Sequence, residues 1–146
     1  EREISKNNEF YYLGKKYNVI LTNLDEISID GNYIYAKNDK LDKWYKNQMK
    51  NIFSERLKAN YNLFDEDIPF PTLRIRTMKT RWGVCNIKTK TVTLNSLLMK
   101  YSIDKLDYVI IHELSHLVHA NHSKEFWNLV SKYCPDYKKI RKELKE

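Results

Sequence analysis

The chain has 146 residues, of which 42% are apolar and 13% aromatic, so it can bury the core of one compact domain. These proportions exclude a wholly disordered chain, and no apolar run approaches the ~18 residues of a membrane span, which excludes a transmembrane protein. The formal net charge is +7, and most of the 26 basic side chains are lysine. Two distant cysteines, Cys85 and Cys134, exclude a disulfide scaffold and predict a reduced, cytoplasmic setting.

The first third of the chain is predicted to be β-rich and then helical. Residues 1–40 hold short runs of β-formers, and Asp30-Gly31-Asn32 separates two of them as the turn of a hairpin does. Residues 41–63 switch to helical spacing, with apolar side chains three and four positions apart. Asn38 or Asp39 is the expected N-cap of this helix.

The rest of the chain is predicted to be strands followed by helices. Two prolines break the chain within the linker 65–71, and residues 73–95 then alternate as three strands would. The last part, residues 96–146, is expected to be helical, with helices at 96–101, 104–119, 123–134 and 136–145. Strands first and helices last predict an α+β fold, in which residues 1–146 form a single domain with a small mixed sheet packed on helices.

All four histidines lie between positions 112 and 122, and residues 112–116 read His-Glu-Leu-Ser-His, the H-E-x-x-H pattern. On a helix His112 and His116 differ by ~40° around the axis and by ~6 Å along it, so both can reach one ion at ~2.0–2.1 Å. Glu113 lies ~100° round from His112, near the ion and angled toward a bound water. Its carboxylate can take a proton from that water and later pass it to a leaving amine, which makes Glu113 the predicted catalytic base.

The back of this helix is predicted to be buried. Ile110, Leu114 and Leu117 lie ~140–200° from His112 around the axis, so the apolar stripe faces the core while the histidines face the opposite side. A helix held by its buried back keeps its ligands rigid, as a catalytic metal requires.

The third ligand is a choice between His119 and His122. On a continuous helix His119 lies ~10 Å along the axis from His112, too far for one ion. His122 can serve if the helix ends first and the chain doubles back, and Asn121 suits that reversal because Asn tolerates the left-handed conformation. Ser123 can then cap the next helix. The spacing therefore predicts His122 as the third ligand, and leaves His119 to orient a neighbour, line the cleft or be exposed.

Three protein ligands leave a fourth position for water, which is the catalytic arrangement. We therefore expect one Zn²⁺ per chain and metal-assisted hydrolysis, most simply of a peptide bond, by a zinc-activated water. Two other classes remain open. One is a basic, nucleic-acid-associated binding module with a structural or degenerate zinc site, and the other is a hydrolase of non-peptide amides that uses the same residues.

Several motifs beyond the histidines occur in a characteristic order: Arg81-Trp82-Gly83-Val84-Cys85, Thr93-Leu94-Asn95, Asp107 to His116, Asn121-His122-Ser123 and Phe126-Trp127. Together they closely resemble the YgjP-like metal-dependent hydrolases, relatives of the WLM and SprT-like zinc metallopeptidases. The resemblance is strong over about residues 74–140. It implies a zincin-like fold, a zinc ion held by His112, His116 and His122, and Glu113 as general base.

Two further side chains are candidates for substrate binding, Arg81 and His119. Arg81 can bind a substrate carboxylate or steady a tetrahedral oxyanion. The structural alternative pairs Arg81 with an acidic residue such as Asp107, while Trp82 packs in the core. Cys85 is an optional extra ligand, although a buried apolar cysteine is the commoner case.

The expected partner is a peptide or protein substrate, with no membrane partner. Basic side chains in segments 74–90 and 138–142 leave a weak nucleic-acid association as a second expectation. Acidic residues interleave the second segment, as on a solvated helix face. The sequence does not determine the oligomeric state.

Overall fold

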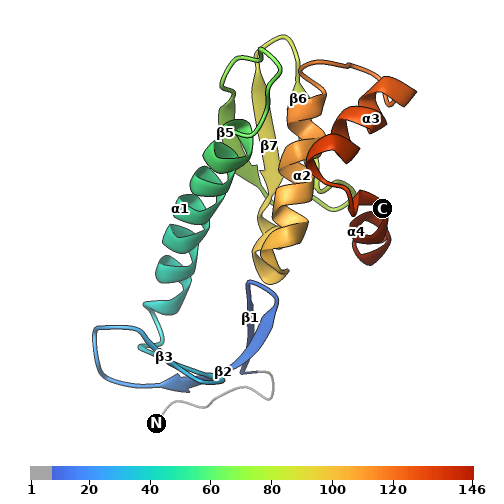
Figure 1. Cartoon of the computed structure of the whole chain (residues 1–146). Coiled ribbons are helices and arrows are strands. Elements are labelled where there is room, and N and C mark those ends of the chain that lie inside the picture. The colour runs from blue at the N-terminus through green and yellow to red at the C-terminus, as the bar shows by residue number, and fades with distance from the viewer. Residues whose placement is uncertain (1–7) are drawn as a thin grey trace.

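The computed structural model describes residues 8–146, so the part of the β-rich segment that precedes Asn8 lies outside the described residues. Figure 1 shows an elongated arrangement, in which a long helix leads from a four-stranded sheet at one end to a three-stranded sheet at the other. Strands dominate the first part and helices the last, so the predicted α+β order is present. That residues 1–146 form a single domain stays a prediction.

The N-terminal sheet has four short strands in the order β1-β2-β4-β3. Their bounds are β1 Glu9–Tyr12, β2 Lys15–Leu21, β3 Ser28–Asp30 and β4 Tyr33–Ala36. Strands β3 and β4 pair in antiparallel fashion, which confirms the hairpin, whereas β2 and β4 pair in parallel.

The turn between β1 and β2 joins this sheet to the rest of the molecule. Leu13 N donates to Met99 O at 2.8 Å and Gly14 N donates to Lys100 O at 3.0 Å. Gly14 has a φ of +86°, and a Cβ on it would lie 2.9 Å from Ser102 N. Glycine is therefore required here both by the left-handed backbone and by the close approach of the next segment.

The long helix α1 spans Leu41–Tyr61 and matches the predicted range within two residues. Its N-cap is Lys40, without a side-chain cap, so the expectation of Asn38 or Asp39 is wrong. Lys40 N donates to Lys37 O at 3.1 Å, which places both expected residues inside a turn that precedes the helix.

The second sheet has three strands in the order β5-β7-β6, with β5 parallel and β6 antiparallel to the central β7. Their bounds are β5 Thr72–Arg76, β6 Gly83–Asn86 and β7 Thr91–Asn95. A 3₁₀-helix at Ser96–Lys100 follows, and Asn95 caps it by accepting a hydrogen bond from Leu97 N at 3.0 Å.

Three helices complete the chain: α2 Ile103–Ser115, α3 Lys124–Tyr133 and α4 Tyr137–Glu143. Helix α2 is central, because it packs against α1, β6, β7, α3 and α4 (Figure 1). The buried side chains in and around it come from α1, β7, α2 itself and α3 and include Phe53, Leu57, Val92, Leu94, Leu106, Ile110, Leu114, Phe126 and Val130. This core fixes α2 on its apolar side.

A polar link also ties α1 to α2. Arg56 Nε donates to Asp107 Oδ1 at 2.9 Å, and Arg56 Nη2 donates to Asp107 Oδ2 at 2.8 Å. Asn60, 3% exposed, donates to Asp107 Oδ1 at 2.8 Å. Asp107 is thus saturated by α1, and the expected pairing of Arg81 with Asp107 is wrong.

Replacing Asp107 with Ala is expected to lower the free energy of unfolding by about 1–3 kcal/mol, because it leaves a guanidinium and a buried amide without their acceptor. Asp42→Ala is the matched control, since Asp42 and its partner Lys46, 3.1 Å away, are largely exposed. That control should cost less than about 0.5 kcal/mol. Urea unfolding of both variants measures the difference, and equal losses would contradict the assignment.

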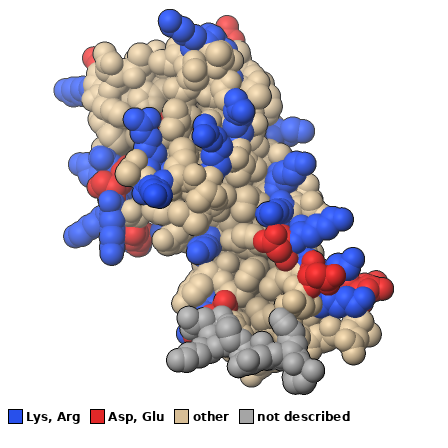
Figure 2. Space-filling model, turned by 180° about the vertical axis from the view of Figure 1, so that it is seen from behind, with Lys and Arg blue, Asp and Glu red and all other residues tan. Residues whose placement is uncertain are grey.

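The surface carries many basic side chains. On the face seen in Figure 2, lysine and arginine are spread over the molecule with acidic side chains among them, not gathered into one continuous stripe. Nucleic-acid association stays a prediction. Among the helices of residues 8–146, none has the length and apolar character needed to cross a membrane.

Candidate metal centre

Helix α2 ends earlier than the predicted range 104–119, with His116 as its C-cap. The last turn tightens, because His116 N donates to Glu113 O and Leu117 N to Leu114 O, three residues back. The Ser115 hydroxyl also donates to Ile111 O at 2.7 Å, and such back-bonding bends a helix at its end. The predicted helical continuation to residue 119 is therefore wrong.

The chain then reverses direction between α2 and α3. Asn121 does not adopt the positive φ expected of it, so that detail is wrong; the reversal begins in the turn after His116. Ser123 N donates to Asn121 O at 2.8 Å. The Ser123 side chain accepts from Phe126 N at 3.2 Å, which confirms it as the N-cap of α3. The reversal returns His122 to the face of α2.

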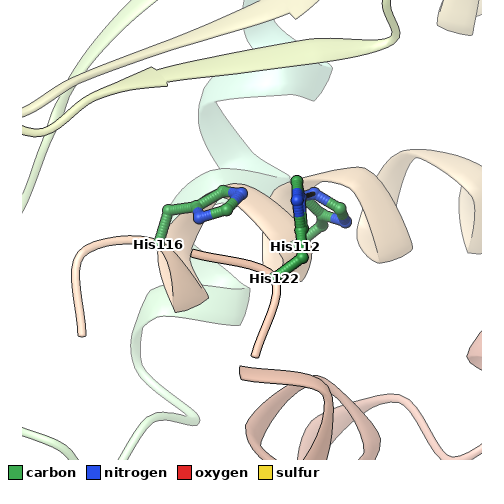
Figure 3. Close-up of side chains that lie close together, drawn as sticks. All are labelled: His112, His116 and His122. Carbon is green, nitrogen blue, oxygen red and sulfur yellow. Dashed lines mark hydrogen bonds between the residues drawn. The ribbon is translucent and has the colours of Figure 1, made fainter. Parts of the chain in front are cut away.

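The three histidines predicted as ligands lie together: His112 is on α2, His116 is its C-cap, and His122 is on the returning loop (Figure 3). Their ligand atoms lie within 4.8 Å of one another, and the Nε2 atoms of His112 and His122 are 3.3 Å apart. Nitrogens bound at ~2.0–2.1 Å around a tetrahedral ion are ~3.3 Å apart by simple trigonometry. The His112–His122 pair matches this spacing, and the third ligand atom lies close enough for the group to hold one ion.

Hydrogen bonds on the far side of two rings orient them. His116 Nδ1 lies 3.2 Å from the carbonyl of His119, and His112 Nδ1 lies 3.1 Å from the hydroxyl of Tyr108. Both rings thus keep Nε2 free for a ligand role. Burial, with neighbouring histidines and Arg141, lowers the pKa of His112 to about 3, and burial also lowers the pKa of His116. The two imidazoles are neutral at neutral pH, as a metal ligand must be.

His119 contributes its main chain to this arrangement. Its carbonyl accepts from His116, whereas its ring is absent from the residues that line the adjacent cavity. The structure thus brings His119 next to the site as an orienting group. Substrate binding by its ring stays a prediction.

Glu113 lies beside the histidines on the inner side of α2 and is 5% exposed. Burial raises its pKa to about 8; Glu146 also raises it, while Arg81 opposes the rise. Strand β6 passes close above it, since a Cβ on Gly83 would lie 2.8 Å from Glu113 Oε2 and from Val109 Cγ1. The carboxylate is therefore wedged between α2 and β6.

Replacing Gly83 with Ala is expected to displace Glu113 and to lower both catalytic rate and stability, the latter by about 1–3 kcal/mol. The added methyl group would clash with Glu113 Oε2 and Val109 Cγ1 at 2.8 Å. Peptide cleavage and thermal unfolding of the variant measure the two effects. Wild-type values for both would show that β6 has room to move.

A cavity of about 770 Å³ opens beside the three histidines and Glu113. Its other walls come from β6 with the residues before it and from the C-terminal segment, and they carry the cations Arg81, Arg141 and Lys145. Cys85 also lines the cavity but is absent from the metal-ligating group found among residues 8–146. Burial raises the pKa of its thiol to about 11. A ligand role for Cys85 stays an untested alternative.

Two aromatic rings of α3, Phe126 and Trp127, pack against the histidines. Phe126 is fully buried and stacks on His116 with ring centroids 4.4 Å apart. Trp127 stacks on His122 with ring centroids 5.8 Å apart. The guanidinium of Arg141 lies over the Trp127 ring, 4.4 Å from the ring centroid. These rings limit the freedom of the ligands.

Two residues that sequence reasoning missed reach the site, Tyr108 and Glu146. Tyr108 lies four residues before His112, so helical spacing alone places it on the same face. Glu146 is 38 residues away from Tyr108 and carries no such signal. Trp82, by contrast, packs as expected at the edge of the core, where its Nε1 donates to Leu144 O at 3.2 Å.

Comparison with known proteins agrees with this geometry. The family model of the YgjP-like metallopeptidase domain matches residues 1–146. The chain belongs to this family. As a YgjP-like domain it is a metallopeptidase, so the predicted enzyme class is confirmed, as is a metal requirement. No curated protein matches the chain significantly.

Two crystal structures resemble this YgjP-like chain. The metallopeptidase zymogen abylysin of Pyrococcus abyssi is 27% identical with a TM-score of 0.57, over 63% of this chain and 90% of that one. The metallopeptidase zymogen jannalysin of Methanocaldococcus jannaschii is 30% identical with a TM-score of 0.46, over 66% and 96% of the two chains. The first likeness confirms the zincin-like α+β fold.

Proposed function

We propose that this YgjP-like chain hydrolyses peptide bonds with one zinc ion, held by His112, His116 and His122, and with Glu113 as general base. The observation that carries the proposal is the convergence of three histidine ligand atoms beside a buried carboxylate at the wall of a cavity. Family membership supports the reaction class, and peptides or proteins are the substrates that such an enzyme takes.

The ligand set favours zinc among divalent ions. Three imidazoles without a carboxylate suit a borderline-soft ion, whereas magnesium and calcium prefer oxygen ligands. When bound, zinc polarises the scissile carbonyl and lowers the pKa of water, and three protein ligands leave a position open for that chemistry.

Glu113 performs the proton transfers in this proposal. Its carboxylate accepts a proton from the attacking water while the water oxygen forms a bond to the carbonyl carbon. The C–N bond then breaks, and the same proton passes to the leaving nitrogen, so the carboxylate is regenerated.

Arg81 is proposed to bind the substrate. It is exposed at the start of the cavity wall that continues into β6, and the structure leaves it without the carboxylate partner considered in the sequence. A guanidinium in that position can bind a substrate carboxylate or the oxyanion that develops during attack.

Purified protein loaded with zinc tests the proposal against fluorescently labelled, unfolded casein. Cleavage should stop after removal of the metal with a chelator and return on addition of one equivalent of zinc. Full cleavage by metal-free protein would contradict the proposal. Cleavage of small non-peptide amides, with casein left intact, would favour the alternative hydrolase.

A further inference from the structure

A hydrogen-bonded chain leads from the C-terminal segment to the first histidine of the centre. Glu146 Oε1 accepts from the Tyr108 hydroxyl at 2.6 Å, and that hydroxyl lies 3.1 Å from His112 Nδ1. Arg141 Nε donates to the same glutamate oxygen at 2.8 Å. We propose that Tyr108 and Glu146 are positioning residues, which hold His112 in the tautomer that presents Nε2 to the metal.

The direction of each hydrogen bond follows from the number of protons available. A carboxylate beside a guanidinium only accepts, so the single hydroxyl hydrogen of Tyr108 points to Glu146. The side of the tyrosine oxygen that faces His112 is then a lone pair. His112 must donate to it from Nδ1, which leaves the lone pair of the neutral imidazole on Nε2, the atom that lies 3.3 Å from His122 Nε2.

Burial makes this chain rigid. Tyr108 is 0% exposed, so solvent water cannot replace Glu146 or His112 as a hydrogen-bond partner of its hydroxyl. Glu146 is held from its own side as well, because its main-chain nitrogen donates to Arg141 O at 2.9 Å. Metal-bound histidines commonly donate their second nitrogen to a carboxylate or carbonyl, and here a tyrosine stands between the imidazole and the carboxylate.

The inference rests on the proposed ligand set. Measured zinc affinity distinguishes a failure of the positioning roles from a failure of the proposed function. Competition with a chromophoric chelator should show zinc binding 10–100-fold weaker in Tyr108→Phe and in Glu146→Ala than in the wild type, the usual loss for such outer partners. Glu143→Ala is the matched control, since Glu143 also lies in the C-terminal segment but pairs with Lys105 at 2.7 Å. Its affinity should stay within about twofold of the wild type, as expected of an outward-facing carboxylate.

A spectroscopic signature distinguishes positioning from simple packing. Zinc-loaded wild type should give a slowly exchanging Nδ1–H proton signal of His112 in NMR, and Tyr108→Phe should lose it. A hydroxyl that merely fills space would leave both the affinity and this signal unchanged.

The outcomes separate cleanly. Wild-type affinity in both variants overturns the positioning roles and leaves the proposed function standing, whereas a wild type that binds no zinc overturns both. Should Tyr108→Phe fail to fold, Glu146→Ala decides, because its side chain is 27% exposed and lies outside the apolar core.

Discussion

Replacing Glu113 with Gln is expected to lower kcat/KM for peptide cleavage by about 10²–10⁴-fold, the usual contribution of a general base. Gln has the same shape as Glu, so it fits the narrow space next to Gly83. That space is tight, because a Cβ added to Gly83 would lie 2.8 Å from Glu113 Oε2. It cannot accept and return a proton. Zinc content should stay at one ion per chain, because the amide replaces no ligand in the histidine group.

Glu125→Gln is the control for this variant. Glu125 lies exposed in the first turn of α3, close to the site in sequence, and does not line the cavity. Its replacement should leave cleavage and zinc content unchanged. Comparable cleavage by the Glu113 variant and the wild type would remove Glu113 from the mechanism without touching the metal assignment.

Replacing His122 with Ala is expected to weaken zinc binding by more than the ~100-fold that outer partners contribute, since it removes one of three ligands. His122 is exposed on the loop, so the metal-free variant should unfold at the same urea concentration as the metal-free wild type. Zinc analysis after dialysis against a weak chelator measures the loss, and cleavage should disappear with it.

His119→Ala is the control for the ligand set. Its ring is outside the metal-ligating group, and the carbonyl that orients His116 belongs to the main chain and survives the substitution. Zinc should therefore be retained. Loss of zinc in this variant, together with retention in His122→Ala, would reverse the choice between the two histidines.

The predictable part of the site is the part with local periodicity. The 3.6-residue repeat of α2 places Ile110 and Leu114 in the core, both at 0% exposure, and leaves His112 and His116 on the open face. The N-cap at Ser123 is likewise a local signal and is confirmed. Such features depend on neighbours a few positions away, so residue spacing is enough to infer them.

Long-range contacts account for what sequence reasoning missed. The partner of Asp107 is Arg56 on α1, 51 residues earlier, and not Arg81. The early end of α2 follows from hydrogen bonds in its last turn, and its position decides where His122 returns. Apolar pattern indicates that a helix is present more reliably than where it stops.

The histidine cluster and the net charge of the chain thus differ in how much they reveal about its function. The clustering of four histidines, with Glu113 among them, was enough by itself to predict a metal-dependent hydrolase on an amphipathic helix, whereas the charge of +7 indicated little. Only the tertiary structure placed Gly83 against Glu113 and brought Glu146 to Tyr108. The reason is physical. Helical periodicity is a property of residues a few positions apart, whereas the approach of distant segments depends on how the whole core packs.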